Sequence, residues 1–229
     1  DLQGFGKQVI IDLNNKTLTL DKAAVFEGEA AQTTFKNGAV NFDNCDAKTN
    51  HYMGDHKNVM KFLVPVVFDN VKMRGENVTA GGAVFSVGAN GEMKMINGST
   101  LDIISPKATA CIEGAEQTAK ITIENSVLNL NGETSDGLRG ILRADVAVSG
   151  SELTIANMSE TALRNVSGVI EEQSTVTIDG GQYGVKNTGS MPALQIVNSE
   201  VTISNTKNDT DNSGIYLEKG DALVIAGNS

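Results

Sequence analysis

Residues 119–130 read Ala119-Lys120-Ile121-Thr122-Ile123-Glu124-Asn125-Ser126-Val127-Leu128-Asn129-Leu130. Two runs of alternating apolar and polar residues flank a short polar corner at Asn125 and Ser126. Successive side chains of a strand point to opposite faces, so each run predicts a short strand with one apolar face. Variants of the same phrase return at residues 93–103, 146–155 and 194–203. This recurrence predicts a repeat architecture.

The copies follow one another at intervals of about 25 residues. We mark each copy by the residue that follows the corner, which gives Lys16, Gly38, Asp69, Ser99, Ser126, Ser151, Ser174, Ser199 and Ser229. The residue before the mark is asparagine in five copies, namely Asn15, Asn37, Asn125, Asn198 and Asn228. Asparagine tolerates the left-handed backbone and can hydrogen-bond to its neighbours, so we expect a structural ladder of asparagines along one edge.

A third short strand is predicted between successive marks, at residues 84–85, 110–112, 140–142, 162–163, 183–185 and 214–217. An antiparallel sandwich gives no reason for strands to recur in threes. A coil of three strands that stacks on itself does, because no single coil could bury its own apolar face. The sequence therefore predicts an all-β protein: one parallel β-helix domain over residues 1–229, with eight to nine coils.

Composition narrows the classes of function. Hydrophobic residues make up 40% of the chain, which suffices for a continuous core, and the formal net charge is −10. This acidity argues against nucleic acid as a partner, and no apolar run is long enough for membrane insertion. Cys45 and Cys111 are the only cysteines, and we expect two buried free thiols rather than a disulfide. Because the chain opens on Asp1 and stops in mid-phrase at Ser229, we also expect neighbouring domains in a longer chain.

Several phrases resemble a known superfamily. Residues 11–19, Ile11-Asp12-Leu13-Asn14-Asn15-Lys16-Thr17-Leu18-Thr19, look like the first coil of pectate-lyase-like right-handed β-helix proteins. The Asn-Ser-x-Val-x-Ile phrases and residues 212–216 are similar to later coils of that superfamily. The resemblance implies right-handed winding, which parallel crossovers also favour. It also implies a function among polysaccharide lyases, glycoside hydrolases and bacterial surface adhesins.

Enzymes of this superfamily need grouped acids and bases on an outward face. The Gly-His-Gly segment of the polygalacturonase-like hydrolases is absent from the sequence. The lyase-like members use calcium-binding aspartates and a basic proton acceptor, which the resemblance would assign to Arg143 or Arg164 beside Asp145. The alternative, which we expect, is that these outward charges pair between coils.

The long interval at residues 43–58 is predicted to leave the rod as a protruding loop. It holds both histidines of the chain, His51 and His56, together with Tyr52 and Asp55. The spacing of these side chains fits no established closed metal site. We therefore treat them as candidate ligand-binding residues.

A second candidate stretch begins at Asp209 and Asp211 and resembles the start of a calcium loop. The acidic residue that should close such a loop is missing, because its position is Gly220. We expect a polar turn and no cofactor, with Ca²⁺ as the alternative.

Tyr183 and Tyr216 both fall in third-strand segments. They are predicted either to share an outward groove or to cap the core. Taken together, these features lead us to expect an extracellular bacterial surface module that acts as an adhesin or stalk. Its partner would be a carbohydrate or a host surface protein, bound without catalysis. The alternative is a polysaccharide lyase or glycoside hydrolase.

Overall fold

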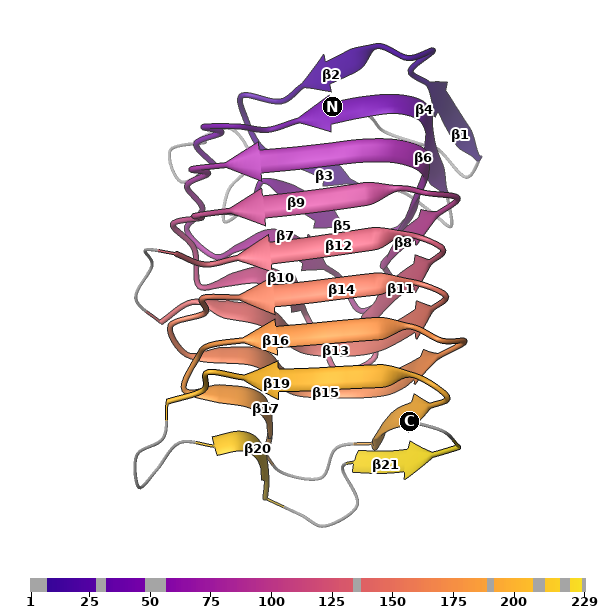
Figure 1. Ribbon diagram of the computed structural model, residues 1–229. Coiled ribbons are helices and arrows are strands. Elements are labelled where there is room, and N and C mark those ends of the chain that lie inside the picture. The colour runs from indigo at the N-terminus through magenta and orange to yellow at the C-terminus, as the bar shows by residue number, and fades with distance from the viewer. Residues whose placement is uncertain are drawn as a thin grey trace.

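The protein is a right-handed β-solenoid. The computed structural model describes residues 8–27, 32–47, 57–133, 137–188, 192–207, 213–218 and 223–227. Its strands stack into a rod of about seven turns, close to the eight or nine predicted (Figure 1). Every pairing between the described strands is parallel. The predicted all-β parallel β-helix is confirmed.

Each turn contributes one strand to each of three sheets. The front sheet in Figure 1 contains β2 (Thr17–Thr19), the second halves of β4 (Thr33–Asn41) and β6 (Pro65–Glu76), β9 (Thr100–Ile104), β12 (Val127–Asn131), β14 (Glu152–Ala156), β16 (Thr175–Asp179) and β19 (Glu200–Ser204). The side sheet contains β1 (Val9–Asp12), the first halves of β4 and β6, β8 (Glu92–Ile96), β11 (Lys120–Glu124), the second halves of β13 (Arg139–Ser149) and β15 (Thr161–Glu171), β18 (Leu194–Val197) and β21 (Leu223–Ala226).

The back sheet contains the third strand of each turn. Its members are β3 (Ala24–Phe26), β5 (Met60–Phe62), β7 (Ala83–Val87), β10 (Ala110–Gly114), the first halves of β13 and β15, β17 (Tyr183–Asn187) and β20 (Ser213–Leu217). The predicted third-strand segments thus form one continuous sheet.

The corner that leads into the front sheet is left-handed in every turn. Its residues, all with φ between 45° and 78°, are Asn15, Asn37, Asn70, Gly98, Asn125, Gly150, Gln173 and Asn198. The Asn70 amide donates to Asn37 Oδ1 at 3.2 Å, so two corner asparagines are hydrogen-bonded, although Asn70 was not among the five predicted. One mark was wrong: Val71, not Asp69, stacks on Gly38 and precedes the strand that pairs with β9. The coil between Gly38 and Val71 is long, and because of its extra residues the predicted mark fell two positions before the residue that stacks on Gly38.

A ladder of buried serines follows the corner. The Ser126 N–H donates to Ser151 Oγ at 3.1 Å, the Ser151 N–H to Ser174 Oγ at 3.3 Å, and the Ser174 N–H to Ser199 Oγ at 3.2 Å. Each hydroxyl also donates to a carbonyl of its own corner. The recurring serine therefore satisfies backbone groups that would otherwise be buried without a partner.

The core changes character along the rod. Six phenylalanines pack together in the first turns, with Phe26–Phe62 and Phe35–Phe68 stacked at 5.6 Å. Later turns are filled by leucine, isoleucine and valine. Cys45 and Cys111 are both free and buried, as predicted.

Candidate functional site

The predicted loop at residues 43–58 begins against the rod. Cys45 and Ala47 are buried, and Asp43 forms an ion pair with Arg74 of β6. Burial, with Asp21 nearby, raises the pKa of the Cys45 thiol to about 11, so this thiol stays protonated near neutral pH. The candidate residues His51, Tyr52, Asp55 and His56 lie outside the described residues.

The candidate calcium ligands Asp209 and Asp211 also lie outside the described residues. Within the ranges that the structure describes, no group of three or more His, Cys, Asp and Glu side chains could hold a metal ion. Calcium binding by this stretch remains a prediction.

Three of the four arginines gather on the outward side of the back sheet. Arg143 forms an ion pair with Glu113 at 2.5 Å. Glu160 lies between Arg139 and Arg164 and forms an ion pair with each of them. The Arg143–Glu113 and Arg139–Glu160 pairs connect neighbouring turns, whereas Arg164 and Glu160 are four residues apart in one turn. Asp145 lies instead on the side sheet, in register with Lys120, and does not share these ion pairs.

These ion pairs bear on the lyase alternative. A proton acceptor must direct a lone pair at the substrate, whereas a guanidinium paired with a carboxylate has its N–H donors directed at that carboxylate. Arg143 and Arg164 are both held in this way. The geometry of Arg143 and Arg164 therefore supports a structural or anion-binding role more directly than a role in proton abstraction.

A continuous file of outward side chains crosses the back sheet. Glu113, Leu142, Arg164, Lys186 and Tyr216 occupy the same position in successive strands. Parallel strands lie about 4.8 Å apart, so each member adjoins the next. We call these five residues the back-sheet file.

The file ends in an aromatic cluster around a lysine. The rings of Tyr183 and Tyr216 meet edge to face with their centroids 5.8 Å apart. Lys186 Nζ lies 3.8 Å from the centroid of Tyr183 and 5.5 Å from that of Tyr216. Tyr183 is buried, while Tyr216 is 43% exposed and presents ring surface to solvent. The structure thus brings the two predicted tyrosines together.

Lys186 is the functional candidate that reading the sequence missed. It is 22 positions after Arg164, at the same place in the next back-sheet strand, as the register shows. A comparison of third-strand positions across copies would have found it. The sequence singled out Tyr183 and Tyr216 as aromatic residues, but no feature of the sequence singled out Lys186.

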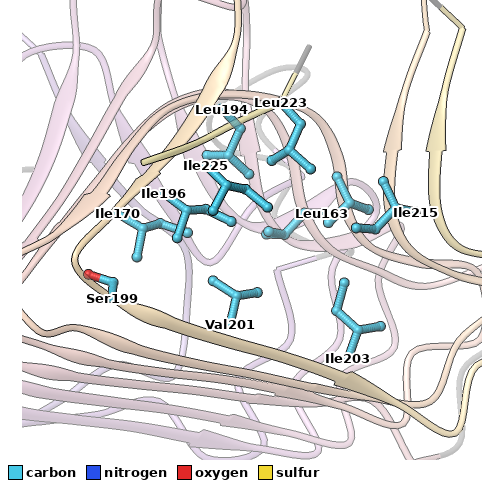
Figure 2. Close-up of a pocket in the computed structure, with 11 residues that line it drawn as sticks. Leu163, Ile170, Leu194, Ile196, Ser199, Val201, Ile203, Ile215, Leu223 and Ile225 are labelled. Atoms are coloured by element: carbon cyan, nitrogen blue, oxygen red, sulfur yellow. The ribbon is translucent and has the colours of Figure 1, made fainter. Parts of the chain in front are cut away.

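An apolar cavity of about 220 Å³ opens at the end of the core near the C-terminus (Figure 2). Its lining includes Val201 and Ile203 of β19, Ile215 of β20, and Leu223 and Ile225 of β21. Ile215 is 44% exposed and Ile225 is 62% exposed. Among the residues that the structure describes, the cavity lies at the last turn of the stacked core. Of its eleven lining residues only Ser199 is polar, so it offers apolar contact rather than chemistry.

No family model, no curated protein and no solved structure matches the chain. Among the described residues, no helix has the length and apolar character needed to cross a membrane.

Proposed function

We propose that this chain is a non-catalytic carbohydrate-binding module of an extracellular bacterial surface protein, built on a pectate-lyase-like solenoid. The saccharide binds at the end of the back-sheet file, on Tyr216. The observation that carries the proposal is the half-exposed Tyr216 ring, braced by Tyr183 and adjoined by Lys186.

The aromatic cluster has the properties of a sugar platform. An aromatic ring offers a flat apolar surface with a polar rim, which suits the apolar face of a pyranose and the hydroxyls around it. The edge-to-face contact with Tyr183 limits the motion of Tyr216, so little conformational freedom is lost on binding. A rigid rod that presents such a platform can act as an adhesive stalk.

A lyase is the second candidate, and one observation favours it. Arg143 has a left-handed backbone, with φ 55°. A bulky residue in this region is uncommon, and such strain is concentrated at functional sites. However, the next turn places Asn165 at the same corner with φ 53°. The corner therefore requires this conformation whether or not Arg143 acts in catalysis.

A panel of immobilised polysaccharides and host glycans tests the proposal. We expect binding without turnover, reduced about fivefold to 150-fold by Tyr216→Ala, since loss of an aromatic stack costs roughly 1–3 kcal/mol. Thr177→Ala, which changes an outward side chain of the front sheet, is the control and should bind normally.

Product analysis on the same panel separates the two candidates. Cleavage that disappears in Arg143→Ala or Arg164→Ala would establish the lyase and reject the binding module. Binding that survives Tyr216→Ala but is lost on deletion of residues 48–56 would move the site to the early loop. The extracellular location predicts that lysines of the chain react with a membrane-impermeant label on intact producing cells.

A further inference from the structure

Two polar atoms on the back sheet are buried without a hydrogen-bond partner among the residues that the structure describes. They are Arg139 Nε and Thr161 Oγ1. Thr161 is fully buried, and the Arg139 side chain keeps 24% of its surface exposed. Buried polar atoms in native proteins almost always bond to the protein or to an ordered water molecule. A donor and a hydroxyl that both lack a partner therefore indicate a place where a small polar molecule binds.

The two residues are neighbours across the back sheet. Ile141 of β13 pairs with Leu163 of β15. Arg139 and Thr161 lie two positions earlier on the same strands, so the same register places them side by side, with backbones about 4.8 Å apart. On the other side of Arg139 its register partner is Ala110, which has only a methyl group and leaves space beside the arginine. The two unpaired atoms therefore belong to one site.

The arginine is already bonded at its other nitrogens. Nη2 forms an ion pair with Glu160, and Nη1 donates to the Thr109 carbonyl oxygen at 3.5 Å. The Nε–H points from the planar guanidinium in the same direction as one N–H of Nη2. A group that accepts from Nε therefore lies next to the Glu160 carboxylate, which Nη2 already contacts.

From these contacts we propose that Arg139, Thr161 and Glu160 bind one buried water molecule. The water accepts from the Arg139 Nε–H and from the Thr161 hydroxyl, and it donates to the Glu160 carboxylate. Three hydrogen bonds are typical of a buried water molecule. Because Arg139 belongs to β13 and the other two residues to the next turn, the water joins neighbouring turns. This site is separate from the saccharide site on Tyr216, and neither depends on the other.

Water fits this place better than an ion does. An anion at Nε would lie against the Glu160 carboxylate, and a cation would lie against the guanidinium. Like charges at hydrogen-bond distance repel strongly where little solvent screens them. A neutral molecule that both donates and accepts meets all three protein groups without that repulsion, and water is the smallest such molecule.

A crystal structure of the whole chain tests the site directly. We expect a water molecule with its oxygen about 2.7–3.2 Å from Arg139 Nε, Thr161 Oγ1 and one Glu160 oxygen. A protein side chain in this place, a direct hydrogen bond between Arg139 and Thr161, or a site without ordered density would each overturn the proposal.

Thr161→Val replaces the hydroxyl by a methyl group of similar size. If the hydroxyl binds the water, the variant loses one of the three hydrogen bonds, and we expect the equilibrium constant for unfolding to rise at least about fivefold. A constant that stays the same or falls would mean that the hydroxyl is simply unpaired, and the proposal would be wrong. Thr177→Val, at an outward position of the front sheet, is the control and should change the constant by less than about threefold. Urea denaturation followed by circular dichroism measures both constants.

A second variant shows whether Thr161 and Arg139 act through the same water. Arg139→Lys keeps the positive charge for Glu160 but has a methylene group in place of Nε. In this background the water has already lost its first donor, so Thr161→Val should raise the unfolding constant less than it does in the wild type. Equal effects in the two backgrounds would mean that the residues share no ligand, against the proposal. Thr161→Ser retains the hydroxyl and should retain the water in a crystal structure, which keeps the site testable if the valine variant fails to fold.

Discussion

The front and back sheets belong to the same turns but carry different side chains outward. On the front sheet, β14, β16 and β19 pair at every position and present Thr154, Thr177 and Thr202 in one row. On the back sheet, the strands of the same turns present Arg164, Lys186 and Tyr216. In this row the front sheet repeats threonine, whereas the row on the back sheet gathers large charged and aromatic residues. The comparison shows that the front sheet can repeat similar residues from turn to turn while the outward residues of the back sheet differ in each turn.

The regular face is also where the core stacks like on like. Leu101, Leu128, Leu153, Val176 and Val201 occupy one inward row of the front sheet. Ile103, Leu130, Ile155, Ile178 and Ile203 occupy the next. Each of the three middle side chains in a row is covered above and below by one of similar size, so substitutions in one of these turns affect three.

The largest expected effect is therefore on this face. We predict that Leu128→Ala lowers the free energy of unfolding by about 3 kcal/mol, because it removes buried methyl groups and leaves a cavity between Leu101 and Leu153. Urea denaturation followed by circular dichroism measures the change. Val127→Ala, the outward neighbour on the same strand, should cost less than about 1 kcal/mol. Equal losses in the two variants would contradict the inward assignment of Leu128.

A smaller effect is expected at the serine ladder. Ser151→Ala removes the acceptor of the Ser126 N–H, which is buried, and an unpaired buried donor costs about 1–3 kcal/mol. Ser149→Ala, two residues earlier, removes a hydroxyl that contacts Glu172 at the surface and should change stability by less than about 0.5 kcal/mol. Similar midpoints for Ser151→Ala and wild type would show that water replaces the missing hydroxyl.

Much of the fold was predictable because the front sheet repeats its phrase. Alternation fixed the strands, and asparagine before the mark located four of the eight described left-handed corners, including Asn37 and Asn125. The error at Asp69 arose where the coil is long: Asn70 forms the corner, and only the pairing of β4 with β6 reveals it. Sequence spacing cannot show which residues of a long coil lie in the strand and which lie in the connection.

The candidate site was less accessible to prediction, for a related reason. Tyr183 and Tyr216 could be placed in the third strands, and the structure puts their rings in contact. Lys186 contacts Tyr216 of the next turn, and Glu160 pairs with Arg139 of the preceding one. Their other contacts, with Tyr183 and Arg164, lie within one turn. Back-sheet strands are short and follow connections of varied length, so the register that brings these side chains together is not visible in the sequence.

The smallest expected effect compares the two faces directly, through one arginine on each. Arg143, at the end of the back-sheet segment of β13, and Arg74, in the front-sheet half of β6, each have side chains 44% exposed and ion-paired with carboxylates. Only Arg143 has a left-handed backbone. That conformation costs an ordinary residue about 1–2 kcal/mol but suits asparagine, and an exposed ion pair contributes at most about 1 kcal/mol. We predict that Arg143→Asn raises the free energy of unfolding by up to about 1 kcal/mol, whereas Arg74→Asn does not raise it. Urea midpoints of the two variants measure the difference. Equal losses would mean that the corner imposes no strain on Arg143. A stabilised Arg143→Asn variant that binds saccharide more weakly would mean that the back sheet retains a strained residue for its ligand.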